Sequence, residues 1–303
     1  MENGENLYLE LFRVSRAELE GLMAKALSSG ADFADIYFEC TNYTNLLLKD
    51  SQVTSGGYHE DFGAGIRVLC GERTGYSCCE TTERRDMEAA VGAAAAICAA
   101  GGCTRNVRAG HAPSGSKYGN AHEKAAAGIK PRDGLYGMKD SWESCSRRKM
   151  AELLKRIDEE LRRRDPRVVK VIAQISDSVS RVMMFNSLGE LTFETRPMGS
   201  VSVSAVFSGH GLDGKPTNIT KSESRSFRMG AEMLSDSLVN ELAEGVLRNL
   251  DARFEAVRPK GGKMPVVMGA GASGILLHEA MGHAFEADFN RKGQSIFSDR
   301  MGQ

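Results

Sequence analysis

The sequence predicts an α+β fold: an N-terminal domain of mostly antiparallel sheet with flanking helices, followed by the beginning of a second α+β domain that carries a motif helix. Two patterns predict it. Short segments between Gly, Asn and Asp residues alternate apolar and polar side chains, as strands with one buried face do. Longer segments repeat apolar residues at helical spacing. The 303 residues, 41% of them hydrophobic, are enough for two cores, which we expect at residues 1–220 and 221–303.

The first part of the chain opens with an amphipathic helix over 16–28, in which apolar residues recur at helical spacing before Gly30 stops it. An Ala-rich helix is expected over 82–100, where Gly101 and Gly102 end it. The segments between these helices are short, rich in β-forming residues and bounded by turn residues. We therefore expect strands at 33–39, 46–49, 65–70 and 75–79.

The middle of the chain begins with residues 110–140, where Gly is frequent and bulky apolar residues are few, so we expect a long ordered loop. Charged amphipathic patterns predict helices over 141–164 and 227–250. Between the two helices the chain reads as an antiparallel meander with a hairpin turn at Asn186–Gly189. Its strands are expected at 168–176, 179–186 and 190–207.

Charge and hydropathy exclude several classes of partner. The chain has 39 Lys and Arg against 40 Asp and Glu, so net charge gives no sign of binding to nucleic acid or to an anionic membrane. No apolar run approaches the roughly 18 residues that a membrane span needs. The N-terminal residues are acidic and polar, unlike a secretory signal. We predict a cytoplasmic protein.

The most informative segment is Leu277–His283, in which two histidines flank about one turn of a predicted helix and Glu279 follows the first. Neutral imidazoles can hold a metal ion, and a neighbouring carboxylate can take a proton from water that the metal activates. The pattern is similar to the H-E-x-x-H signature of zinc proteases, but it has one more residue between the histidines.

The additional residue sets a geometric condition. At about 100° per residue, side chains five positions apart point roughly 140° apart around an ideal α-helix. His278 and His283 therefore reach one ion only if the helix has a π-bulge or a kink between them. Gly282 tolerates such a distortion. Without it, the two histidines would belong to a surface helix end.

The flanking residues favour a functional site. Residues 264–268 are expected to form a short buried strand, 269–274 a tight turn and 275–277 a buried helix start. An ionisable trio that emerges directly from apolar elements is typical of a site rather than of a solvated surface. Glu286 and Asp288 follow and could act as further ligands or as partners of the ligands.

The turn before the motif offers an alternative, because Gly269, Gly271 and Gly274 match the dinucleotide-binding pattern G-x-G-x-x-G. That fold also requires a second buried strand with an acidic end about twenty residues later. The corresponding span holds the motif and a polar stretch, so we interpret the glycines as the turn that places His278.

The segment from Val266 to Phe289 closely resembles the signature of the TldD/PmbA family of metallopeptidases, and residues 30–37, 63–68 and 75–76 resemble it too. The resemblance covers nearly the whole chain, and its H-E-x-x-x-H block is typical of the TldD-like catalytic subunit. It implies a cytosolic peptidase that cleaves small or unfolded peptides. It also implies a homo- or hetero-oligomer with a related TldE/PmbA-like subunit. Within the motif, His278 and His283 correspond to the metal ligands and Glu279 to the general base.

The chain departs from this family in one respect. The family's third metal ligand is a Cys in its C-terminal half, whereas all seven Cys of this sequence precede the motif. We therefore expect an N-terminal fragment or a truncated gene product. A site of two histidines should bind metal weakly unless Glu286 supplies the third ligand. The metal is expected to be zinc, or another divalent metal such as iron. The predicted function is metal-dependent peptide hydrolysis; the alternative is a non-catalytic binding or assembly subunit that pairs with a related peptidase chain.

Overall fold

The computed structural model describes residues 2–71, 73–99, 136–271, 273–300 and 302. The chain forms two compact units, Met1–Ala256 and Val257–Gln303. The sequence analysis placed the division at residue 220. The structural division falls later, because a strand and helices that follow residue 220 pack with the first unit. Most of the loop expected over 110–140 lies outside the described residues.

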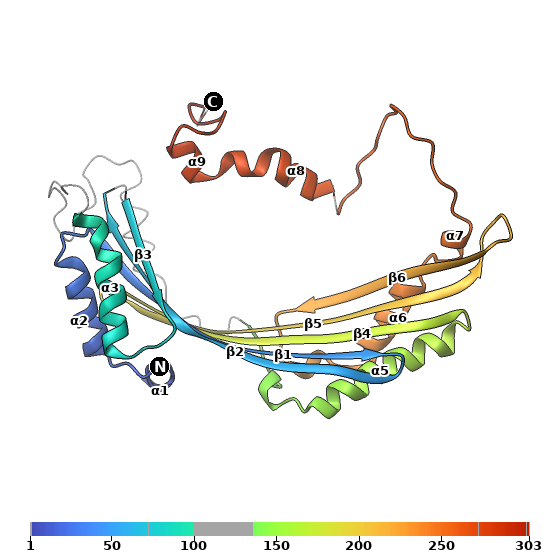
Figure 1. The fold of residues 1–303 in the computed structure, drawn as a ribbon, viewed down its shortest axis with the longest axis horizontal. Helices are drawn as coiled ribbons and strands as arrows, with labels where there is room; N and C mark the ends of the chain where they lie inside the picture. The colour runs from blue at the N-terminus through green and yellow to red at the C-terminus, as the bar shows by residue number, and fades with distance from the viewer. Residues whose placement is uncertain (1, 72, 100–135, 272, 301, 303) are drawn as a thin grey trace. The chain divides into compact units, whose positions relative to one another are not determined.

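The first unit is built on a six-stranded antiparallel sheet in the order β3-β2-β1-β4-β5-β6 (Figure 1). Strands that follow one another in the sequence pair as hairpins, apart from β3 and β4. The sheet is completed by the pairing of β1 with β4. The predicted α+β class with an antiparallel sheet is confirmed. The strands are β1 (Phe33–Lys49), β2 (Gln52–Cys70), β3 (Arg73–Cys79), β4 (Val168–Asn186), β5 (Leu191–His210) and β6 (Pro216–Phe227).

The strands are longer than the sequence patterns predicted. The expected strands 33–39 and 46–49 are one strand, as are 168–176 and 179–186. Asn42 and Asn45 resemble turn residues, yet they lie inside β1, where both neighbouring strands pair with them. Pairing on both sides of a strand outweighs the local preference of single residues. The predicted helix 227–250 was wrong at its start, since β6 extends to Phe227.

Helices cover one face of the sheet. At one end lie α1 (Glu2–Leu11), α2 (Arg16–Leu27) and α3 (Arg84–Ala99), and α5 (Arg147–Arg164) and α6 (Asp236–Leu247) lie at the other (Figure 1). Shorter elements are the 3₁₀ turns η1 (Trp142–Ser144) and η2 (Ala231–Met233) and the helix α7 (Leu250–Phe254). None of the helices in the described residues is long and apolar enough to cross a membrane.

Two hydrophobic cores lie under these helices, on the same face of the sheet. Alternate residues of β1 reach both: Ile36 and Phe38 belong to the core beneath α1–α3, and Leu46 and Leu48 to the core beneath α5 and α6. All four side chains are at most 6% exposed. Asn42, also an even-numbered position of β1, falls between the cores. The covered face is therefore apolar at both ends and polar in the middle.

Gly75 of β3 lies so close to α3 that its substitution tests how this helix packs on the sheet. A Cβ atom at Gly75 of β3 would overlap the carbonyl oxygen of Ala94 in α3, whereas Gly92, on the exposed side of α3, has open space. We predict that Gly75→Ala lowers the free energy of unfolding by about 1–3 kcal/mol. Gly92→Ala is the matched control and should raise it by about 0.5–1 kcal/mol, because Ala favours the helix. Chemical denaturation measures both, and equal effects would contradict the packing.

Asp177 of β4 gives a second prediction. Its side chain is 7% exposed, and burial raises its pKa to about 7. The folded state then holds a proton that the unfolded chain releases near pH 4, so this group destabilises the fold as pH rises from about 4 to 7. Asp177→Asn should match the wild type near pH 4 and exceed its unfolding free energy by on the order of 1 kcal/mol at pH 8. A difference that does not change with pH, measured by denaturation, would contradict this.

Candidate metal centre

The second unit carries the motif on three short elements: helix α8 (Ser273–Met281), the 3₁₀ turn η3 (Gly282–Phe285) and helix α9 (Ala287–Arg291). His278 and Glu279 lie in the last turn of α8, and His283 lies in η3. Gly271, with φ +114°, supplies a backbone conformation just before α8 that favours glycine. The glycine-rich turn thus leads into the motif helix.

The helix breaks between the two histidines. Met281 has φ −135° and ψ −37°, and the chain continues from there as a 3₁₀ turn instead of an α-helix. The irregularity required by the five-residue spacing is thus a change of helix type rather than a π-bulge. As a result, the imidazole rings of His278 and His283 lie with their centroids 4.5 Å apart and their planes at 69°.

Gly282 leaves room for this arrangement. A Cβ atom at this position would lie 3.3 Å from Nδ1 of His278, closer than most side chains tolerate. A larger residue would therefore push the His278 ring away from its present position. The sequence analysis assigned Gly282 a tolerance for distortion; the structure adds that it faces a predicted ligand.

Glu279 and Glu286 contact opposite nitrogens of His283. Nε2 lies 3.7 Å from Oε2 of Glu279, and Nδ1 lies 2.5 Å from Oε1 of Glu286. A carboxylate accepts hydrogen bonds, so Nδ1 is the nitrogen that carries hydrogen and Nε2 of the neutral ring is free to act as a ligand. The hydrogen bond to Glu286, with the charges of both carboxylates, raises the pKa of His283.

The three motif side chains converge. One potential ligand atom from each of His278, Glu279 and His283 lies within 4.8 Å of the others, and all three residues are exposed. In the described residues, neither Glu286 nor Asp288 belongs to this group. Glu286 instead lies behind His283, where its carboxylate fixes the orientation of the ring.

Two side chains that the sequence analysis did not single out hold the turn together. Asn290 donates from Nδ2 to the carbonyl oxygens of Ala284 and Glu286, each at 3.0 Å. Ser295 donates from Oγ to the Ala284 oxygen at 2.6 Å. Both side chains thus bind the Ala284 carbonyl near the end of η3, and the Glu286 carbonyl also accepts the backbone N–H of Asn290 at 3.1 Å. Their only signal in the sequence is the Asn and Ser that follow the motif.

The apolar flanks of the motif are not buried within this unit. Residues 264–268 were expected to form a buried strand, but they have no regular secondary structure, and Val267 is 96% exposed. Leu277, expected in a buried helix start, is 62% exposed. Both predictions were wrong. A strand needs a paired neighbour, and residues 264–268 have none among the described residues of this unit. The short helices of the unit cannot enclose the side chain of Leu277.

Comparison with known proteins identifies the family. The chain matches the PmbA/TldA metallopeptidase domain 1 over residues 34–98, the central domain over 141–250 and the C-terminal domain over 261–303. The first two regions share the single sheet of the first unit, and the third contains the histidine motif.

Individual relatives agree with this match. The chain is 28% identical over 277 residues to a Haemophilus influenzae protein named a metalloprotease TldD homolog, in a match that covers 90% of this chain and 53% of that protein. A protein of the same name from Buchnera aphidicola is 27% identical over 275 residues, with 90% and 53% covered. The chain thus spans about half the length of these relatives.

A solved structure is similar in fold. TldE from Thermococcus kodakarensis superposes with a TM-score of 0.59 at 14% identity, over 93% of this chain and 58% of that one. All three family domains occur here in order, and together they cover more than half of the sequence. The chain belongs to the PmbA/TldD family of metallopeptidases, a class that implies a divalent metal.

Proposed function

We propose that this chain is part of a TldD-type, metal-dependent peptidase that hydrolyses small or unfolded peptides. The observation that supports it most directly is the helix break at Met281, which brings the two imidazoles and the Glu279 carboxylate together. An uninterrupted α-helix would separate the histidines. The cytoplasmic location stays a prediction.

The donor set fits a divalent transition metal. Imidazole nitrogens and carboxylate oxygens are ligands for zinc, and also for iron, so we propose zinc with iron as the alternative. His278 and His283 would hold the ion, the latter through Nε2 because Glu286 occupies its Nδ1. When bound, such a metal supplies a Lewis acid that polarises the peptide carbonyl.

Glu279 is proposed as the general base. Its carboxylate lies on the Nε2 side of His283, 3.7 Å from that nitrogen, and so adjoins the position that a ligand atom would share. There it would accept a proton from the attacking water and return it to the leaving amine. The same closeness allows a second role, as a third metal ligand, and catalytic zinc commonly has three protein ligands.

We also propose that residues 257–303 pack against another protein surface, in a homo- or hetero-oligomer with a related TldE/PmbA-like subunit. Exposed apolar side chains support this, Val267 and Phe285 among them, because contiguous apolar surface is typical of association sites. The alternative function, a non-catalytic assembly subunit, would use the same surface without hydrolysis.

Substitution of Glu279 separates these roles. If Glu279 is the base, Glu279→Gln retains the metal and loses peptide hydrolysis by about 10²–10⁴-fold. Loss of the metal itself would make Glu279 a ligand instead. Metal content by mass spectrometry and cleavage of an unstructured peptide measure the two effects, with Glu255→Gln, an exposed position, as the matched control. Hydrolysis that persists in Glu279→Gln, or metal that persists in His283→Ala, would contradict the proposal.

Substitution of Glu286 tests its hold on His283. In the metal-free protein, Glu286→Gln should lower the pKa of His283, because the carboxylate that stabilises the charged ring is gone. Metals bind the neutral imidazole, so the metal affinity of the wild type should rise as pH passes through the pKa of His283. The metal affinity of the variant should reach its highest value at a lower pH, because its His283 loses its proton earlier. Its plateau affinity should fall about 10–100-fold, since the ring loses its orienting partner. NMR titration and metal competition measure these effects; an unchanged affinity would remove Glu286 from the site.

A further inference from the structure

The centre of the sheet carries a second polar site, in the first unit. A cavity of about 350 Å³ lies where β1, β2 and β4 meet the turn η1 and the start of α5. Pockets for small ligands commonly occupy about 300–1,000 Å³. Its polar and charged lining consists of Asn42, Thr44, Tyr58, Glu143, Arg147 and Asp177. The cavity falls between the two hydrophobic cores, where the covered face of the sheet is polar.

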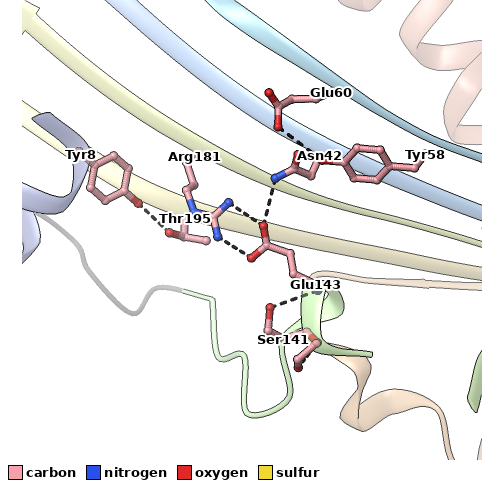
Figure 2. Close-up of polar contacts among 9 residues, drawn as sticks. Tyr8, Asn42, Tyr58, Glu60, Ser141, Glu143, Arg181 and Thr195 are labelled. Carbon is pink, nitrogen blue, oxygen red and sulfur yellow. Dashed lines mark hydrogen bonds and ion pairs between the residues drawn. The ribbon is translucent and has the colours of Figure 1, made fainter. Parts of the chain in front are cut away.

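Most polar groups around this cavity satisfy one another. The Arg181 guanidinium donates to both carboxylate oxygens of Glu143, at 2.9 and 2.5 Å (Figure 2). Asn42 donates from Nδ2 to Oε1 of Glu143 at 3.0 Å, and the Tyr58 hydroxyl donates to Oδ1 of Asn42 at 2.6 Å. This network fixes the wall of the cavity and leaves Glu143 neutralised by Arg181.

Asp177 is the exception. Its side chain is 7% exposed, and among the described residues its Oδ2 has no hydrogen-bond partner. A buried carboxylate oxygen without a donor is costly and uncommon in native structures. Arg147 is the cation that acts on it, but this side chain reaches toward Gly56 of β2, where an added Cβ would lie 4.0 Å from its Nη1. Among the described residues, Arg147 acts on Asp177 through its charge alone, without a hydrogen bond.

We propose that this cavity binds an organic cation with N–H donors, an ammonium or guanidinium group, and that Asp177 is its acceptor. Val179 and Trp142 provide apolar walls for the carbon chain that would carry the charge. A metal ion is disfavoured because Asp177 alone offers a free carboxylate here. An anion is disfavoured because the group without a hydrogen-bond partner here is the carboxylate oxygen of Asp177. This site is independent of the metal centre and of the proposed peptidase activity.

The proposal predicts a pH dependence. Burial raises the pKa of Asp177 to about 7, so a cation that requires the ionised carboxylate should bind about tenfold more tightly at pH 8 than at pH 6. Of the other titratable groups at the cavity, Glu143 has its pKa lowered by Arg181, and Cys145 and Tyr58 have theirs raised by desolvation, so each moves away from this range.

Calorimetry on the full chain tests the site at pH 8 with three probes: n-butylamine for a lysine side chain, methylguanidine for arginine and n-butanol as the neutral isostere. At least one cation should bind and n-butanol should not, and the strongest cation identifies the group recognised. Asp177→Asn should weaken that binding about 10–100-fold, the loss of one charge-assisted hydrogen bond, and abolish its pH dependence. Asp213→Asn, in an exposed turn, is the matched control.

Arg147→Ala gives an independent readout. Removal of the cation that opposes the ligand should tighten binding of the amine, while the circular dichroism spectrum and melting temperature report that the variant is folded. Equal affinity in wild type and folded Asp177→Asn would overturn the proposal. So would binding of n-butanol as tight as that of the amines, no binding of any of the cations, or weaker amine binding in folded Arg147→Ala.

Discussion

The pairing of β1 with β4 is the constraint on which the first unit depends. It runs without interruption from Asp35–Asn186 to Lys49–Ile172, and it joins two sets of hairpins that are otherwise separate. Because side chains alternate along each strand, this register places both apolar ends of β1 on one face. A shift by one residue would turn Ile36 and Leu48 away from their helices. The two cores, and the polar interval between them, follow from that register.

In residues 257–303 the corresponding constraint is the change of helix type at Met281. It aligns two histidines that their spacing would otherwise separate, and it requires a small residue at position 282. Asn290 and Ser295 both bind the Ala284 carbonyl that follows His283, and Glu286 fixes the outward nitrogen of His283. The turn that carries His283 is therefore supported by side chains that follow the motif. These contacts link the change of helix type at Met281 to the proposed binding of metal by His278 and His283.

Local patterns were sufficient for the fold class and for much of the site. Alternation revealed the antiparallel strands, and the five-residue spacing of the histidines required a break that the structure contains. The features that the sequence did not predict depend on contacts between residues far apart in the chain. The strand β1 continues through Asn42 because β2 and β4 pair with it, and the isolation of Asp177 arises only when strands and η1 meet around one cavity. The segment 264–268 reads as buried, yet burial depends on neighbours that its own pattern does not specify.

The central claim is that His278 and His283 bind one metal ion. X-ray absorption spectroscopy of the zinc-loaded protein tests it most directly, since imidazole rings give a recognisable scattering pattern. The account predicts two imidazole nitrogens at about 2.0–2.1 Å from the zinc. A coordination shell without imidazole, or with one imidazole only, would contradict it.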